Sequence, residues 1–231
     1  MDVTKSITYI FQDKRWFTKL LIGRLVSSVP ILNFAFTGYS TETIKNVEDK
    51  REFPLPEWDD FGKKFVLGFY MWIAGLVYAL PILILTSLFI IPILFTSNGD
   101  MGDAAGAIIG GSALVYTCIV GLYGLALTLF LPAMNINLAR KGSLGSCFAL
   151  SEIIRIFSRN SGDYLLSWLM TVVWAIAIIT AVSIITPFLI LIPCIGWIAA
   201  IMLGGLAGVA IPLVYAHLFG QVAAREIERV E

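Results

Sequence analysis

Charged residues are scarce in this chain and are missing altogether from three long segments. Asp, Glu, Lys and Arg make up 14% of the 231 residues, whereas they make up about 25% of an ordinary soluble domain. Neither they nor histidine occur in 65–95, 104–138 or 164–216. A soluble fold of this size would need a far more polar surface. The composition therefore excludes a soluble globular protein and indicates a membrane protein.

Residues that membrane enzymes and metal sites require are scarce as well. His217 is the only histidine, and the three cysteines, Cys118, Cys147 and Cys194, are far apart without a CxxC pair. The predicted spans contain no acid, and the sequence has no phosphate loop of the GxxxxGK[ST] type. We therefore expect no catalytic residue, no cofactor and no metal. The net charge is zero, so nucleic acid is not an expected partner.

The three uncharged segments predict four transmembrane helices. About 20 apolar residues cross the hydrocarbon core as a helix, so the first two segments supply one span each and the third supplies two. Helices are the expected form because lipid tolerates no unsatisfied backbone. We expect an all-α, polytopic membrane protein with a single transmembrane domain over 1–231 and spans at 65–95, 104–138, 164–192 and 195–222.

Positive charge is confined to one side of this predicted topology. All 16 Lys and Arg residues lie near the termini or in the segments 38–64 and 139–162. The connectors 96–103 and 193–197 contain none. Cytoplasmic loops of membrane proteins are enriched in Lys and Arg. We therefore expect a multi-pass protein of the cell membrane with both termini in the cytoplasm.

One shorter segment, 20–37, is apolar enough for a marginal fifth span. It contains Arg24, Pro30 and Asn33, and a proline interrupts the hydrogen-bond ladder of a helix. A crossing here would also move the basic N-terminus outside. We favour a proline-broken helical hairpin that enters or lies in the cytoplasmic leaflet, within a region of re-entrant or interfacial helices at 1–47. A true fifth span is the alternative.

The string PLPEWDDFGKKF, at 54–65, lies in a predicted cytoplasmic elbow, 48–64, before the first full span. The residue before each proline avoids the helix, which keeps the chain extended. Trp58 is a ring of the kind that settles at the headgroup level. Asp59 or Asp60 is expected to cap the new helix, and Lys63 and Lys64 to extend toward anionic headgroups. Each residue has a physical role here without catalysis.

Two further patterns predict helix packing and a surface helix. Apolar residues of 144–157 recur on one helical face, which predicts a cytoplasmic amphipathic helix. Small residues at four-residue steps let helix backbones approach closely, and we expect packing within the chain, with a dimer interface as the alternative. These small residues are Gly102, Gly106 and Gly110 in one series and Ala200, Gly204 and Gly208 in the other.

Several short strings form a set that extends over much of the chain. They are Trp16, PILNF at 30–34, Gly38-Tyr39, KNV at 45–47, LPEWDDF at 55–61, IPCIGW at 192–197 and HLFGQ at 217–221. This set resembles the prokaryotic membrane family catalogued as domain of unknown function 4013. The resemblance implies a small multi-span membrane protein and implies no activity.

We interpret the chain as a non-enzymatic integral membrane protein with a structural or accessory role. Its expected partners are the lipid bilayer and either individual lipids or another membrane protein. A small transporter or channel module with proline-broken helices is the main alternative, and an enzyme is the third. The residues given interface or structural roles are Trp16, Pro30, Asn33, Pro56, Trp58, Asp59, Asp60, Gly204, Gly208 and His217.

Overall fold

The computed structural model describes residues 1–96 and 103–228, with side chains outside 92–110. The described residues are helical apart from turns and short connections. Four helices are long and apolar enough to cross a membrane, which confirms the four predicted spans. They are α4 (Phe61–Thr96), α5 (Asp103–Lys141), α7 (Ser161–Ile190) and α8 (Ile195–Glu228).

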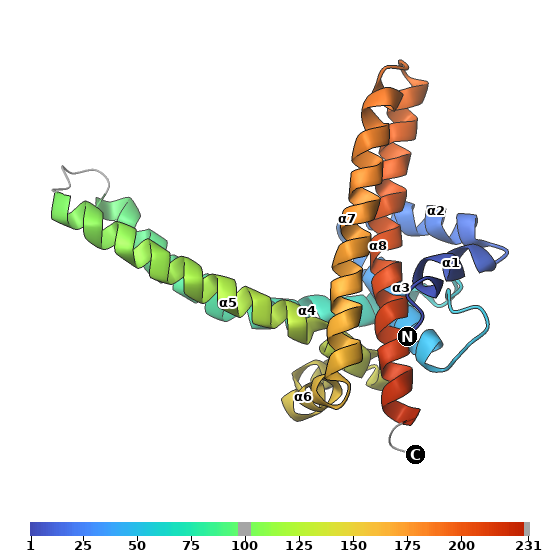
Figure 1. The fold of residues 1–231 in the computed structure, drawn as a ribbon, viewed down its shortest axis with the longest axis horizontal. Helices are drawn as coiled ribbons and strands as arrows, with labels where there is room; N and C mark the ends of the chain where they lie inside the picture. Colours follow the sequence, from blue (N-terminus) through green and yellow to red (C-terminus); the bar gives the residue numbers. More distant parts are fainter. Residues whose placement is uncertain (97–102, 229–231) are drawn as a thin grey trace.

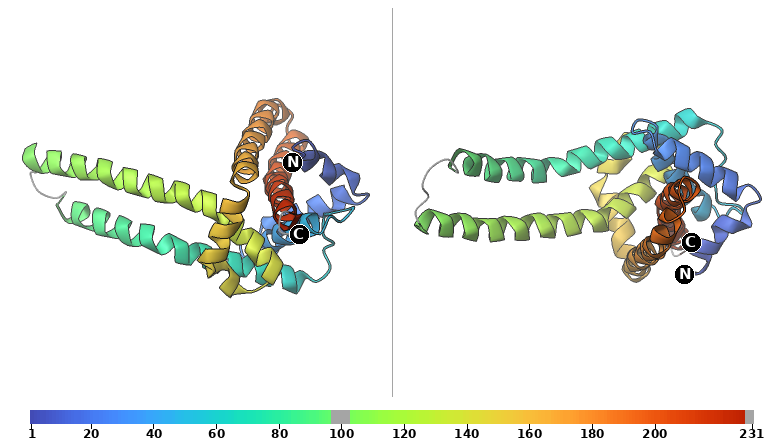
Figure 2. Two further views of the ribbon diagram at one scale, coloured as in Figure 1. Left: turned by 60° about the horizontal axis from the view of Figure 1, so that its bottom comes forward. Right: turned by 90° about the horizontal axis from the view of Figure 1, so that it is seen from above.

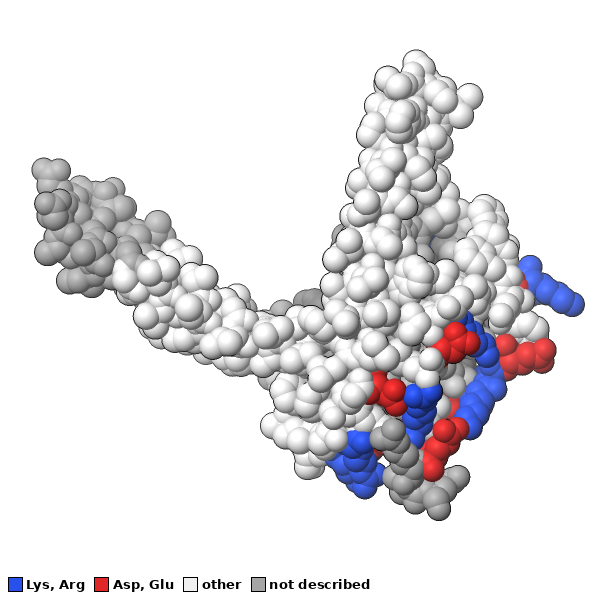
Figure 3. All heavy atoms as spheres, viewed as in Figure 1, with Lys and Arg blue, Asp and Glu red and all other residues white. Residues whose placement is uncertain are grey.

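The long helices form two hairpins that diverge from a common base. Helices α4 and α5 run side by side, and so do α7 and α8, but the two pairs point in different directions (Figures 1 and 2). Both chain ends lie near the base (Figure 1). Lys, Arg, Asp and Glu gather at the base, whereas the described parts of both hairpins are free of them in the view of Figure 3. One end of the molecule is therefore polar and the two arms are apolar.

The N-terminal region adds three short helices to this base. They are α1 (Lys5–Gln12), α2 (Trp16–Ser27) and α3 (Asn33–Glu48), and Pro30 lies in the turn between the last two. The predicted helical break at Pro30 is confirmed, and no helix in 1–60 is among the candidate membrane spans. The depth of this hairpin in the bilayer stays a prediction.

Helix α3 is the centre of the base although it is the most polar of the N-terminal helices in composition. It packs against α2, α4, α5 and α8, and most of its residues are buried. Glycines permit the closest approaches. A Cβ on Gly38 would lie 1.7 Å from the Lys64 carbonyl oxygen, and one on Gly68 would lie 1.8 Å from that of Phe34. A Cβ on Gly220 would lie 2.5 Å from the Cβ of Val47.

The segment predicted as one amphipathic helix is divided in two. A 3₁₀ helix, η1 (Leu144–Phe148), precedes α6 (Leu150–Arg159), and Ala149 between them has non-helical ψ of 71°. The side chain of Asn137 donates to the Ser146 carbonyl and to Glu152, both at 2.9 Å. The prediction of one continuous helix is therefore wrong, because a neighbouring helix holds the two parts separately.

Candidate functional site

A buried ionic network joins the helices of the base. The Arg140 Nε of α5 donates to Glu48 of α3 at 2.6 Å, and its Nη1 donates to Glu226 of α8 at 2.8 Å. A third bond runs from Nη2 to the carbonyl of Ala223 at 3.2 Å. The Glu48 and Glu226 side chains are 1% and 5% exposed. The arginine thus pairs with two buried carboxylates and ties three helices together, and Lys45 and Arg159 lie 3.2 and 3.9 Å from the same carboxylates.

Neutral polar side chains also join α3 to the long helices α5 and α8. The Thr41 hydroxyl donates to the Asn135 side chain at 2.8 Å, which connects α3 with α5. The hydroxyl of Ser40 donates to the Pro212 carbonyl of α8 at 3.1 Å. Buried polar groups are costly unless hydrogen-bonded, so these pairs hold α3 in one register against both hairpins.

A side chain from α7 interrupts the backbone hydrogen bonding of α5 next to Pro132. The Tyr164 hydroxyl donates to the Leu129 carbonyl at 2.5 Å and accepts from the Ala133 amide at 2.9 Å. Those two backbone groups would bond to one another in a regular α-helix. The hydroxyl thus stands in for a hydrogen bond of the ladder next to a proline, where an inserted group is a recognised cause of helix bending.

The elbow is fastened to α2 by a buried lysine. The Lys19 ammonium bonds Asp13 at 2.7 Å, Glu57 at 2.9 Å and the Leu55 carbonyl at 2.9 Å. Burial acts to raise the pKa of Asp13, but the hydrogen bonds from Lys19 and the Arg15 amide outweigh it and lower the pKa. The Asp13 carboxylate is therefore held in its charged form.

Trp58 lies against Tyr39, with the ring centroids 4.5 Å apart and the planes nearly parallel. Its indole N–H donates to the Lys19 carbonyl at 3.0 Å. The Tyr39 hydroxyl is buried without a hydrogen-bond partner among the described residues. Burial, followed by the charges of nearby groups including Asp13 and Glu57, raises the Tyr39 pKa. The tryptophan thus fixes the elbow to α3, and its headgroup-level placement stays a prediction.

Two predictions for the start of α4 are wrong. The Lys64 side chain is 1% exposed and pairs with Glu42 of α3 at 3.1 Å, so it does not extend toward headgroups, whereas Lys63 is exposed and its placement stays a prediction. In the described part of the chain, neither the Asp59 nor the Asp60 carboxylate accepts a capping bond from a backbone amide in the first turn of α4. Asp60 instead has a positive φ of 42°, and Asp59 lies 3.7 Å from Lys64.

The other predicted interface residues occupy different environments. Trp16 is half-buried and makes an edge contact with Phe11 at 5.0 Å, whereas Pro56 is buried in the elbow. Pro30 and Asn33 are exposed at the turn between α2 and α3. The structure therefore does not bring this predicted set together at one place.

His217 is buried at the base and serves as a packing residue. Its ring stacks on Tyr9 of α1 at 4.3 Å, and its Nδ1 lies 3.0 Å from the Gln221 amide nitrogen. That amide nitrogen also donates to the Asp2 carbonyl at 2.9 Å. Because an amide nitrogen can only donate, His217 accepts on Nδ1. The imidazole thus helps to fasten the N-terminal helix to α8.

The close approach on α8 occurs at a glycine that the four-residue pattern did not include. A Cβ on Gly204 or Gly208 would meet no atom within 4 Å, whereas one on Gly205 would lie 1.6 Å from Nε of Arg24. Packing within the chain at Gly204 and Gly208 is therefore a wrong prediction, and the dimer alternative stays open. Gly102 and the side-chain surroundings of Gly106 and Gly110 lie outside the described part of the chain.

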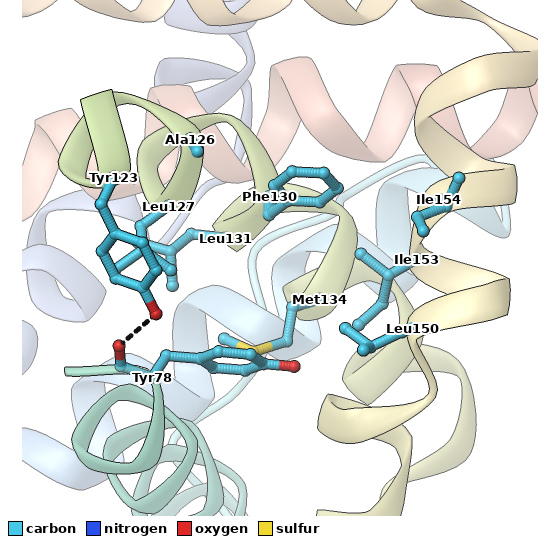
Figure 4. Close-up of a pocket in the computed structure, with 10 residues that line it drawn as sticks. All are labelled: Tyr78, Tyr123, Ala126, Leu127, Phe130, Leu131, Met134, Leu150, Ile153 and Ile154. Carbon is cyan, nitrogen blue, oxygen red and sulfur yellow. Dashed lines mark hydrogen bonds between the residues drawn. The ribbon is translucent and has the colours of Figure 1, made fainter. Parts of the chain in front are cut away.

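Two hollows of different character adjoin these clusters. An apolar cavity of about 230 Å³ lies between α4, α5 and α6, and Figure 4 shows its walls. The Tyr123 hydroxyl on its wall donates to the Tyr78 carbonyl at 2.9 Å, and the Tyr78 hydroxyl donates to the Cys147 carbonyl at 3.0 Å. A polar groove of about 800 Å³ lies along the elbow, with charges of both signs on its walls.

The described residues contain no group of three or more His, Cys, Asp or Glu side chains arranged to hold a metal ion. A family model described as "Protein of unknown function (DUF4013)" matches residues 23–188. The chain belongs to this family. No curated protein and no solved structure matches the chain.

The match confirms the family that the short strings suggested for this DUF4013 protein. The matched residues, 23–188, contain PILNF and LPEWDDF, whereas Trp16 and the strings at 192–197 and 217–221 lie outside them. Within it, Gly38 makes the close crossing with α4 and Trp58 fastens the elbow. The strings that carry the resemblance thus include residues that assemble the base.

Sequence reasoning missed the residues that assemble the base of the DUF4013 protein. From the sequence, Arg140 is only one of the positive charges of 139–162, and no role is predicted for Tyr164. Arg140 could have been found by its position, since it directly follows a span. Tyr164 gave no such signal, because it lies opposite Pro132 only after folding. Such pairings join residues that are far apart in the sequence.

Proposed function

We propose that this protein is a non-enzymatic structural or accessory component of the cell membrane, with both termini in the cytoplasm. The observation that carries the proposal is how the chain uses its buried polar groups. Arg140, Asn135 and Tyr164 each form a hydrogen bond with a helix other than their own. These groups, which a catalytic site would direct toward a substrate, are used here to join helices.

The charged base supports the cytoplasmic placement of the termini. The base carries the Lys and Arg side chains seen in Figure 3, and positive charge is retained on the cytoplasmic side of membranes. Both hairpins then cross the bilayer and return. Ser161–Ile190 has 30 residues, a length of roughly 45 Å as a helix. A helix of this length is long enough to cross a core of about 30 Å with some tilt.

The diverging hairpins support an accessory role. Both expose large apolar side chains, such as Leu122 of α5 at 70% and Ile176 of α7 at 59%. The two arms diverge from the base (Figures 1 and 3), so in a bilayer that both cross they would bound a wedge-shaped region. A partner membrane protein or ordered lipid fits a wedge of this kind, because its walls are apolar.

Site-specific photocross-linking in intact membranes tests this role. A benzophenone amino acid at Leu122 or Ile176 is expected to give a discrete cross-linked protein, identified by mass spectrometry. Ile198 of α8, near the tip of the second hairpin, is 64% exposed and serves as a comparison position of similar exposure. Lipid adducts alone at every position would contradict an accessory role with a protein partner.

A small transporter or channel module is the second candidate, and the opened ladder at Pro132 favours it. A cavity of about 270 Å³ lies beside that opening, with Thr128, Thr171 and Tyr215 among apolar neighbours. Reconstitution into planar bilayers tests this candidate. Reproducible conductance steps that disappear in Tyr164→Phe would support it, and a silent bilayer with correctly folded protein would contradict a channel.

A further inference from the structure

The Arg24 side chain lies against α8 at a position where any residue larger than glycine would overlap it. Helix α2 packs against α8 and lies beside its middle part in Figure 1. A Cβ on Gly205 would fall 1.6 Å from Nε and 2.1 Å from Cδ of Arg24. The glycine therefore leaves room for the arginine stem across the surface of α8.

The Arg24 guanidinium has no carboxylate partner in the part of the chain that the structure describes. Its Nη1 donates to the Ser28 hydroxyl at 2.7 Å, and that hydroxyl donates to the Arg24 carbonyl at the same distance. A guanidinium carries five N–H donors in a planar fork. One neutral hydroxyl leaves its charge uncompensated.

Exposed apolar side chains follow Arg24 along the chain, in α2 and in the turn after it. Leu25, Val29 and Ile31 are 62%, 45% and 66% exposed. Side chains of this kind in the turn between α2 and α3 favour the acyl region of the bilayer over water. A cation beside them is costly unless an anion accompanies it, and the anions at the edge of the acyl region are lipid phosphates.

We propose that Arg24 binds the phosphate of a membrane phospholipid, with Ser28 orienting the guanidinium. The planar fork of arginine matches phosphate oxygens in a bidentate arrangement. The α2–α3 hairpin is then held in the leaflet by a lipid as well as by its apolar side chains.

Native mass spectrometry of the full chain, titrated with phosphatidylglycerol in mixed micelles, tests the proposal. Arg24→Gln is expected to weaken lipid binding about tenfold or more, as expected for the loss of a charge-assisted hydrogen bond. Gly205→Ala retains the charge but displaces the arginine, and it is expected to weaken binding likewise. Gly204→Ala is the matched control, because its methyl group meets open space.

The comparison ligands separate phosphate recognition from other binding. Diacylglycerol with the same acyl chains lacks the phosphate and is expected to bind weakly to every variant. Equal binding of diacylglycerol and phosphatidylglycerol would overturn the proposal, because the acyl chains alone would then be recognised. Full displacement of the lipid by inorganic phosphate would overturn the lipid as the source of the anion. If Gly205→Ala and Arg24→Gln remain folded by circular dichroism and bind as wild type does, the proposal is wrong.

Discussion

At the residue scale, stability of the base depends on a few buried charges that have complete sets of partners. Arg140 pairs with Glu48 and Glu226, which Lys45 and Arg159 also approach, and Lys19 pairs with Asp13 and Glu57. Removing one member of a buried ion pair leaves an uncompensated charge, which costs more than the pair itself contributes. The effects of mutation are therefore expected to depend strongly on burial.

Arg140→Gln is expected to destabilise the protein by about 3–5 kcal/mol, because Glu48 and Glu226 would lose their shortest ion pairs and keep only Lys45 at 3.2 Å and Arg159 at 3.9 Å. Thermal unfolding in detergent micelles measures the effect. Lys141→Gln is the control, since Lys141 is 47% exposed and pairs with Glu152 at the surface, where a pair is worth about 0–1 kcal/mol. Equal losses for the two variants would contradict the central role of Arg140.

Asp13→Asn is expected to lower the melting temperature at neutral pH, and the loss is expected to fade on acidification. The folded state lowers the pKa of Asp13, so the unfolded chain takes up its proton at a higher pH than the folded protein does. The stability that this carboxylate contributes is therefore present above its unfolded pKa of about 4 and is lost below it. Melting curves between pH 7 and pH 3 measure this. A gap between wild type and variant that does not change with pH would exclude the linkage.

At the scale of elements, α3 shows how a polar helix becomes a central one. Its Gly38, with Gly68 of α4 and Gly220 of α8, allows the neighbouring backbones to come close, and its hydroxyl groups then find partners on α5 and α8. The close contacts at Gly38 and Gly68 involve backbone atoms, which cannot rotate away as a flexible side chain can. Substitutions at these crossings therefore shift whole helices.

Gly38→Ala and Gly204→Ala are expected to act in opposite directions. The methyl group at Gly38 would overlap the Lys64 carbonyl, and such overpacking costs about 1–3 kcal/mol or more. At Gly204 the space is open, so the higher helix propensity of alanine is expected to add up to about 1 kcal/mol. Melting temperatures in the same detergent compare the two. A destabilised Gly204→Ala would point to a contact outside this chain, such as a dimer.

Tyr164→Phe is expected to cost about 1–3 kcal/mol, because the Ala133 amide and the Leu129 carbonyl lose their buried partner. Hydrogen exchange at the Ala133 amide is expected to accelerate. Tyr123→Phe is the control, since its hydroxyl donates to a carbonyl inside a continuous part of α4. Unchanged exchange at Ala133 would mean that α5 closes its own hydrogen bond there and that the hydroxyl is dispensable.

At the scale of the whole molecule, an apolar half and a charged half are separated along one direction. The hairpins carry the lipid-facing residues, and the base carries both termini and the ionic network (Figures 1 and 3). A bilayer can accommodate both hairpins only if each tilts, because they diverge from their common base. The length of the spans is in keeping with such a tilt.

Labelling with an impermeant maleimide tests the orientation. In a Cys118→Ser background, Cys194, which is exposed at the turn between α7 and α8, is expected to react in intact cells. A cysteine at Lys14 is expected to react only after permeabilisation. Cys147 is buried, and burial raises the pKa of its thiol to about 11, so it is expected to stay unlabelled in both conditions. Labelling of Lys14→Cys in intact cells would reverse the proposed topology.

The sequence by itself determined the class of the protein, its four spans and the helical break at Pro30. These features depend on properties that add up locally. The free energy of placing a helix in lipid is a sum over consecutive residues, and a proline interrupts the helix wherever it occurs. The family resemblance also lay in short contiguous strings, which is why it could be found before the fold was known.

Only the tertiary structure decided which residues meet. The four-residue pattern of small residues selected Gly204 and Gly208, but the position of α2 on α8 places the close contact at Gly205. Lys64 lies at the start of a span, where a lysine is expected to extend toward headgroups, and is instead buried against Glu42. Helix crossing sets such partners, and it depends on all the contacts of both helices at once. A local pattern therefore predicts that a helix packs closely, whereas the folded chain determines the residue at which it does so.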